Sequence, residues 1–313
     1  MPVKSVSTPK FTFRFLLPKY WPVWLGMAIL YVISWLPFSM ILRVGKGVGY
    51  LLQILAKKRV AVARRNIELT FPQWNKEKKE AVLKANIERT GIALFETAMG
   101  WWWPGWRVKK HIEIEGFEHV EKVLSSGKGL FGLALHNVNL EFACRAIGYR
   151  QPSIGFYRKH NNPLVDYLQY HGRSRSNKYM IDKRNAKAFI QAMNQGELCL
   201  YLPDQDYGAA QSIFVPFGGV EKTATTTATL MFAERANCVP MLVTSMYTNT
   251  GYKIKFFPAI EYFADNNIDA ALTQLNKDIL SIVELQPESY LWMHKRFKTR
   301  PEEAPESLYE RLK

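Results

Sequence analysis

Acidic residues are absent from the first 67 positions of this 313-residue chain, although the same stretch contains eleven lysines and arginines. The remainder holds 31 basic and 27 acidic residues, so most of the formal net charge of +15 comes from the N-terminal fifth. A basic segment beside an apolar one is typical of a chain that lies against anionic lipid headgroups. The charge distribution therefore favours a membrane-associated N-terminus.

Cysteine is also scarce, with only Cys144, Cys199 and Cys238 and no CxxC pair. This number and spacing argue against a disulfide framework and against a cysteine-ligated zinc site. We expect three packed thiols in a reducing compartment.

Several well-known catalytic motifs are missing. The chain has no GxSxG elbow, no Walker-type GxxxxGK and no GxGxxG between a strand and a helix. Nothing therefore indicates a serine hydrolase, nucleotide chemistry or hydride transfer. The glycines at 45, 47 and 49 lie in the wrong setting for a nucleotide site and are expected to let the end of the N-terminal anchor pack closely.

One long apolar run is present, from Tyr20 to Leu42, with 23 residues and no charge. A helix of that length could cross a hydrocarbon layer of about 30 Å. Because Pro22 and Pro37 lie near its ends, a helix in the membrane interface is the alternative. A cleaved signal peptide is disfavoured, since the run is long and no small-x-small site follows it.

The rest of the chain alternates between helical and strand patterns. Residues 43–70 and 75–103 are expected to be helical. Strands are then expected at 111–115, 129–135, 153–157, 197–202, 239–247 and 252–258, with helices at 139–146, 163–171, 184–194, 223–236, 266–284 and 288–297. This order predicts an α/β fold with a mostly parallel mixed sheet flanked by helices. The predicted parts are an N-terminal membrane anchor (1–43), a basic helical region (44–110) and the α/β domain (111–313).

His136 and Glu141 are the first candidate site residues, because the carboxyl ends of parallel strands usually carry the chemistry. His136 ends an apolar strand, and Glu141 falls in the first turn of the next helix. On one regular helix their side chains would point about 140° apart, so they can meet only if His136 precedes the helix, with Asn139 as a possible N-cap. A charged Glu141 beside the imidazole would support His136 as a general base. A cap and a surface contact at a strand–helix corner is the alternative.

Two further clusters are polar. Residues 158–184 are rich in Lys, Arg and His, opposed only by Asp166 and Asp182. This stretch is either a solvated basic face or a surface for an anionic substrate; no fold typical of nucleic-acid recognition accompanies it. Asp204 and Asp206 follow another apolar strand, but no second carboxylate cluster supports a metal site.

Six blocks of the chain, in order, resemble the late lipid A acyltransferases, the lauroyl and myristoyl transferases related to glycerolipid acyltransferases with an H-x4-D/E motif. These blocks are HNVNLE (136–141), GFYRKHNNPLVDYL (155–168), GRSRSNKYMIDKRN (172–185), YLPDQDYG (201–208), FVPFGGVEKTATTTATL (214–230) and SYLWMHKRFKTRP (289–301).

The resemblance implies a membrane acyltransferase that moves a lauroyl or myristoyl chain from acyl carrier protein to a hydroxyl of a lipid A precursor, without a metal or bound cofactor. It places the enzyme on the cytoplasmic side of the bacterial inner membrane. It implies His136 and Glu141 as the catalytic pair, Arg158 and Arg173 as acceptor-binding residues, and Asp204 as an arginine-orienting residue. Another glycolipid or lysophospholipid acceptor, or a non-catalytic protein that binds anionic lipid, are the alternatives. The oligomeric state stays open.

Overall fold

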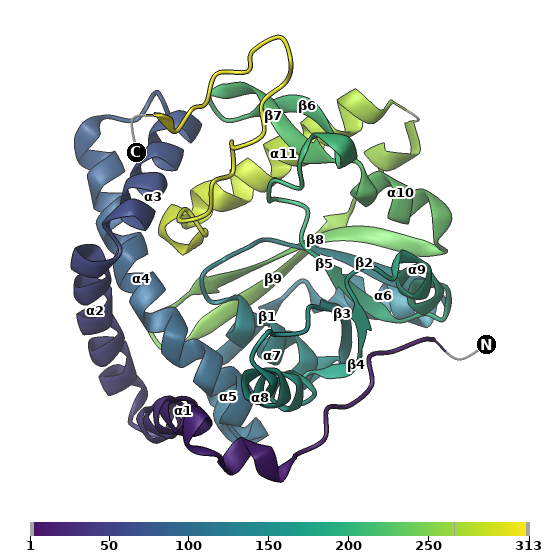
Figure 1. Cartoon of the computed structure of the whole chain (residues 1–313). Helices are drawn as coiled ribbons and strands as arrows, with labels where there is room; N and C mark the ends of the chain where they lie inside the picture. The colour runs from purple at the N-terminus through teal and green to yellow at the C-terminus, as the bar shows by residue number, and fades with distance from the viewer. Residues whose placement is uncertain (1–2, 266, 311–313) are drawn as a thin grey trace.

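A seven-stranded sheet lies at the centre of the molecule (Figure 1) in the computed structural model, which describes residues 3–265 and 267–310. The strand order is β1-β9-β8-β2-β5-β3-β4. Strands β8, β2, β5, β3 and β4 are parallel, whereas β9 runs antiparallel to β8 and carries β1 parallel to itself. The predicted α/β fold with a mostly parallel mixed sheet is confirmed. The bounds are β1 (Ile112–Glu115), β2 (Gly129–Ala134), β3 (Ser153–Tyr157), β4 (Asn177–Asp182), β5 (Leu198–Tyr201), β8 (Cys238–Tyr247) and β9 (Tyr252–Ala259).

Helices cover both faces of this sheet. All six residues of β2 are buried, as expected for a central strand whose side chains point alternately to two apolar layers. Leu130 packs in the layer that contains α6 (Phe117–Ser125) and α7 (Leu140–Arg150). Phe131 packs in the opposite layer, formed in part by α9 (Ala186–Asn194), α10 (Ala228–Arg235) and α11 (Ile268–Leu285).

Asparagine side chains start several of the helices. Each accepts a hydrogen bond from a backbone N–H in the first turn, which satisfies a donor that has no partner inside the helix. The capped helices are α4 (Lys76–Trp102), α8 (Pro163–Arg173), α9 and α11, with caps Asn75, Asn162, Asn185 and Asn267.

The N-terminal apolar run is not one helix, so the prediction of a single helix over 20–42 is wrong. It forms α1 (Trp21–Ser34) and the start of α2 (Phe38–Leu55), separated at Pro37. The break is stabilised from outside: Trp103 Nε1 donates to the carbonyl oxygen of Ser34 at 2.6 Å, and Arg107 donates to that of Leu36. These bonds satisfy carbonyl groups that a continuous helix would have paired.

The break changes which helix could span a membrane. At 14 residues, α1 is about 21 Å long, short of a hydrocarbon core of about 30 Å. Within the described ranges, α2 with its 18 residues is the one helix long and apolar enough to cross.

Close backbone contact joins α2 to α4. A Cβ on Gly45 would lie 2.7 Å from Ile92 Cα, one on Gly49 would lie 2.7 Å from the Ile87 carbonyl oxygen, and Gly91 faces both glycines. The expectation of close packing is confirmed for Gly45 and Gly49, whereas Gly47 faces open space. The predicted border at residue 43 would cut α2.

Other predicted elements differ in type. Residues 220–226 form β7 (Val220–Thr226), paired with β6 (Ser212–Phe217) in a separate two-stranded sheet, so the helix expected from 223 begins only with α10. The helix expected over 288–297 is a short 3-10 turn, Pro287–Ser289, followed by irregular chain. The basic helix expected over 43–70 is interrupted at Ala56, after which α3 (Lys57–Thr70) begins. Strand β4 and helices α5 (Gly105–Lys110) and α6 were not predicted. Residue 266, where another helix was expected to begin, lies outside the described residues.

Candidate active site

His136 and Asp204 meet at the carboxyl edge of the sheet. His136 follows β2 and Asp204 follows β5, and these two strands are paired neighbours. One Asp204 carboxylate oxygen lies 2.6 Å from His136 Nδ1, and the other accepts a 2.8 Å hydrogen bond from the His136 backbone N–H. Both oxygens therefore hold the same residue, which fixes the ring and its loop together.

The charge on Asp204 sets the histidine tautomer. Asp204 is fully buried. Burial raises its pKa, but the charge and hydrogen bonds of His136 lower the pKa by more than burial raises it. The net pKa therefore lies below the ordinary aspartate value. A carboxylate accepts but cannot donate, so it keeps the proton on Nδ1. The Nε2 atom is then the ring position that can take a proton from a substrate.

Glu141 does not take the place predicted for it beside the imidazole. Its carboxylate receives three hydrogen bonds from the Arg173 guanidinium and one from Trp101 Nε1 at 3.2 Å. Glu141 lies in the first turn of α7, which begins at Leu140. Asn139 does not cap that helix; its side-chain oxygen accepts from Ser245 Oγ at 2.6 Å.

The two acids thus exchange the partners that the sequence suggested. Asp204, expected to orient an arginine, orients His136, and Glu141, expected beside the histidine, binds Arg173. Burial lowers the pKa of Arg173, but the Glu141 charge raises it more, and the net pKa is above the ordinary value. Trp101, Glu141 and Arg173 form a compact cluster from α4, α7 and α8. The close approach of α8 to Trp101 requires glycine at position 172, because a Cβ there would lie 2.3 Å from Trp101 Cγ.

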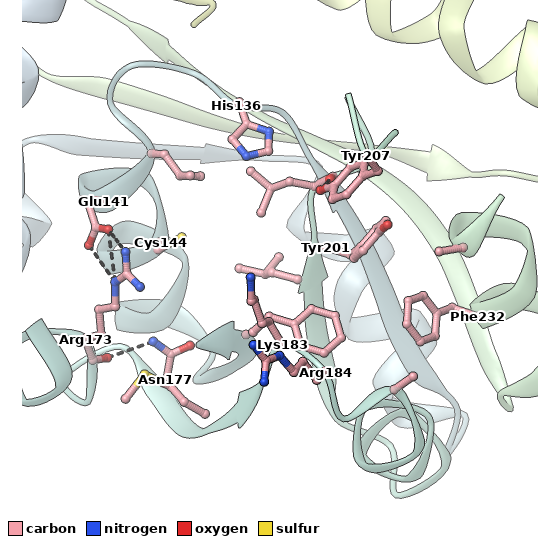
Figure 2. A pocket seen from close by; sticks show the side chains of 18 of the residues that line it. His136, Glu141, Cys144, Arg173, Asn177, Lys183, Arg184, Tyr201, Tyr207 and Phe232 are labelled. Atoms are coloured by element: carbon pink, nitrogen blue, oxygen red, sulfur yellow. Dashed lines mark hydrogen bonds and ion pairs between the residues drawn. The ribbon is translucent and has the colours of Figure 1, made fainter. Parts of the chain in front are cut away.

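A cavity of about 930 Å³ joins these groups. Figure 2 shows His136 above it, the Glu141–Arg173 pair at one side, and Tyr201, Tyr207 and Phe232 at the other. Its wall is mainly apolar toward β3, β4, β5 and α10, where it includes Phe156, Met180, Leu200, Met231 and Phe232. The sequence alone did not locate this apolar wall, whose chemistry suits a hydrocarbon chain.

The basic residues divide between the cavity and the surface. Arg173 lines the cavity as predicted. Arg158 is exposed and does not belong to the lining, so the expectation that both arginines face the site is met by one of them. Lys183 and Arg184, which follow β4, line the cavity instead. Sequence reasoning missed them because it did not place a strand before them.

The C-terminal block holds the histidine loop in place. The backbone N–H of Leu291 donates to the His136 carbonyl oxygen at 2.8 Å, and that of Val138 donates to the Ser289 carbonyl oxygen at 2.8 Å. The Tyr290 hydroxyl donates to the Asp204 carbonyl oxygen at 3.0 Å. This segment therefore positions both members of the His136–Asp204 pair.

The second acid of the PDQD motif has a structural partner. Asp206 accepts from the backbone N–H of Thr299 at 2.6 Å and from its hydroxyl at 2.8 Å. Across residues 3–265 and 267–310, no group of three His, Cys, Asp or Glu side chains is arranged to hold a metal ion.

Comparison with known proteins gives a consistent result over nearly the whole chain. Residues 8–299 match the family described as "Bacterial lipid A biosynthesis acyltransferase". The chain is 38% identical to a lipid A biosynthesis lauroyltransferase of Escherichia coli (strain K12), over 96% of this chain and 98% of the relative. It is 37% identical to a lipid A biosynthesis palmitoleoyltransferase of the same organism, over 93% and 96%.

A lipid A biosynthesis acyltransferase of Haemophilus influenzae is 36% identical over 98% of this chain and 100% of its own length. Among solved structures, a 1-acyl-sn-glycerophosphate acyltransferase from Thermotoga maritima aligns weakly, with a TM-score of 0.39 and 10% identity over 83% of this chain and 96% of that one.

Proposed function

The chain belongs to the bacterial lipid A biosynthesis acyltransferases, and within that family we propose that it transfers a medium or long fatty acyl chain from acyl-acyl carrier protein to a hydroxyl of an acylated lipid A precursor. The observation that supports this most is His136, held by the buried Asp204, on the wall of a cavity that has both an apolar and a basic part. A base beside space for a lipid chain suits acyl transfer to a lipid hydroxyl.

In the proposed mechanism, His136 Nε2 removes the proton from the acceptor hydroxyl. The oxygen then attacks the thioester carbonyl, and the new C–O bond forms as the C–S bond breaks. The carrier thiolate leaves and recovers the proton from His136. Asp204 keeps the correct tautomer and stabilises the imidazolium formed in between.

Glu141 stays part of the proposal, in a different role from the one that its spacing to His136 suggested. It holds the Arg173 guanidinium at the cavity wall through a bidentate contact to both carboxylate oxygens. We propose that this fixed cation helps to position the acceptor or to stabilise the developing oxyanion, so that loss of either residue reduces transfer.

The acyl chain proposed is lauroyl or myristoyl, as the sequence resemblance implies. Overall identity does not select it, because relatives at 38% and 37% identity carry the names lauroyltransferase and palmitoleoyltransferase. The length and shape of the apolar part of the cavity are the features on which the choice would depend.

We also propose attachment to the bacterial inner membrane, with the catalytic domain on the cytoplasmic side where acyl carrier protein is available. The exposed faces of α1 and α2 support it, since Leu25 is 65% and Ile54 is 64% exposed. Apolar side chains presented on a helix surface rather than packed inside usually mark an interaction surface.

The test is an assay of the full chain in detergent with carrier protein charged with acyl groups of 12, 14 or 16 carbons, following acylation of a lipid A precursor by mass spectrometry. The expected product carries one added acyl chain and is absent with His136→Ala. A lysophospholipid offered in parallel separates the alternative acceptor. No product with any lipid A precursor would overturn the proposal.

A further inference from the structure

Two cations at the mouth of the cavity have no acidic partner. Lys183 and Arg184 are both exposed and both contribute to the cavity lining. Neither side chain forms an ion pair within the described part of the chain. Figure 2 shows them across the cavity from His136, between the Glu141–Arg173 pair and the tyrosines.

Other basic side chains close to the cavity are already committed. Arg173 is already paired with Glu141. Arg175 donates to the carbonyl oxygens of Trp101 and Trp102 at 3.0 and 3.1 Å, and Lys178 pairs with Glu197 at 2.5 Å. Among the described residues, Lys183 and Arg184 are therefore the cavity-lining lysine and arginine without an acidic partner.

The backbone that carries them is fixed. The N–H of Lys183 donates to the Tyr157 carbonyl oxygen at 3.1 Å, which ties the end of β4 to the end of β3. The N–H of Arg184 donates to the Asp182 carboxylate at 2.9 Å. Asp182 is thus used by a backbone group, and the two side chains start from an ordered turn at the same sheet edge as His136.

We propose that Lys183 and Arg184 form an anion subsite that binds a phosphate group of a substrate at the mouth of the cavity. A guanidinium and an ammonium side by side offer several donors to a phosphate, in directions that suit its tetrahedral oxygens. The inference rests on the proposed function for the identity of the substrate. Two sources carry such a group: the phosphorylated sugar of the acceptor and the phosphopantetheine arm of the donor.

Kinetic comparison of variants tests the subsite. Lys183→Ala and Arg184→Ala should each lower kcat/KM by roughly 5- to 50-fold, mainly through KM, because a charge-assisted contact at a partly exposed site is lost. Lys187→Ala is the matched control, since Lys187 is an exposed lysine on the next helix outside the cavity lining, and it should change kcat/KM by less than about twofold.

Substrates without phosphate identify the source. If the acceptor phosphate binds here, the loss in the variants disappears with a dephosphorylated acceptor. If the donor phosphate binds here, the loss disappears with acyl-pantetheine as donor. An equal loss with all four substrates, or no loss with any, overturns the subsite while leaving acyl transfer by the wild type intact.

A binding measurement separates this inference from catalysis. In the His136→Ala background, which should bind without turnover, affinity for the phosphorylated acceptor and for acyl carrier protein is measured in detergent with and without Arg184→Ala. The subsite requires weaker binding of one of the two ligands. Unchanged affinity for both would rule it out even if the variant enzyme were slow.

Discussion

At the scale of single residues, the reactivity of His136 depends on which atom of its ring carries the proton. Asp204→Asn should lower kcat by about 10²- to 10⁴-fold, because the amide can donate to Nδ1 and so favour the tautomer with the proton on Nε2. The matched control is Asp206→Asn, whose partner is Thr299; it should affect the melting temperature more than kcat. Steady-state kinetics and thermal melting of both variants check this.

Adding Glu141→Gln to this comparison decides whether Asp204 or Glu141 supports the histidine. If Asp204→Asn keeps its kcat while Glu141→Gln loses it, the acid that supports His136 is Glu141, as the HxxxxE spacing suggests. If both variants lose kcat, each is combined with His136→Ala to distinguish them. Asp204→Asn should reduce the remaining kcat of His136→Ala only slightly, since His136 and Asp204 act as one unit.

The three thiols should not take part in transfer. Burial, followed by the nearby Glu141 charge, raises the pKa of Cys144 to about 12. Burial raises the pKa of Cys238 to about 11 and that of Cys199 well above its ordinary value. At neutral pH they stay protonated and are poor nucleophiles. A variant with all three changed to Ala should keep activity within about an order of magnitude, allowing for lost packing. Radiolabelled acyl enzyme that chases into product would contradict direct transfer.

Glu96 should make stability depend on pH. Glu96 lies on α4 and is fully buried, and its carboxylate accepts hydrogen bonds from the Tyr247 and Tyr252 hydroxyls at 3.0 and 2.7 Å. Burial raises its pKa to about 7; the two tyrosines and Arg89 oppose this without reversing it.

The sign follows from where the proton is held more tightly. Between about pH 4.5 and 7 the folded state keeps a proton that the unfolded state has released, so the free energy of unfolding falls as pH rises, by up to about 3 kcal/mol. Glu96→Gln should remove this dependence. Compared with the wild type, the variant should therefore gain stability at pH 8 relative to pH 5. Urea unfolding in detergent at both values measures it, with Glu77→Gln, exposed on the same helix, as the control.

At the scale of elements, apolar strands could be predicted from sequence and polar ones could not. Strand β2 is a continuous buried run, and all six of its residues were predicted as strand. Strand β4, NKYMID, lies at the sheet edge with only two residues fully buried, so its pattern is weak. Strand β7, VEKTATT, contains Val220 and three threonines, which favour a strand over a helix, and it pairs with β6; the expected helix from 223 passed over this preference. Because β4 was not predicted, the position of Lys183 and Arg184 at the end of a strand was not recognised.

The C-terminal block is the element whose role the structure changes most. Tyr290→Phe should remove the hydroxyl contact to the Asp204 carbonyl oxygen, costing about 0.5–1.5 kcal/mol of stability and lowering kcat several-fold through the His136–Asp204 pair. Tyr262→Phe is the control. The Tyr262 hydroxyl donates a 2.7 Å hydrogen bond to Asp278, and neither residue belongs to the cavity lining. The control should lose stability without a change in kcat. Equal kcat losses in the two variants would mean that the effect is general destabilisation.

At the scale of the whole molecule, family membership followed from the order of six sequence blocks and the fold from the alternation of strand and helix patterns, whereas the pairing of the charged groups followed from neither. His136 and Asp204 are 68 residues apart, and Glu141 and Arg173 are 32 apart. Only the strand order, which sets β5 beside β2, brings the first pair together. The spacing predicted that His136 would meet Glu141 if His136 preceded the helix. The helix does begin after His136, at Leu140, but Glu141 pairs with Arg173 and His136 with Asp204.

Membrane attachment is the property that involves the whole N-terminal part of the molecule. The outward side chains of α1 include Trp21, Leu25, Ile29 and Val32, each at least half exposed. Inward residues are packed: Ile41 at the start of α2 is 0% exposed and lies in a cluster with Phe95, Met99 and Trp103. The same segment therefore has an apolar face toward solvent and another that belongs to the fold.

These two faces give opposite expectations for substitution. Leu25→Glu with Ile29→Glu should weaken binding to anionic vesicles by at least about tenfold, since burying each aliphatic side chain in lipid contributes roughly 1.5–3 kcal/mol. Melting in detergent should change little, because neither residue packs inside. Ile41→Glu should instead lower the melting temperature strongly, since it would bury an unpaired charge. Deleting residues 1–43 should behave like Ile41→Glu, because it removes Ile41 and cuts α2, whose glycines pack on α4. Vesicle co-sedimentation of the double variant decides the matter: full retention on vesicles at an unchanged melting temperature would mean that the apolar face of α1 does not touch the membrane.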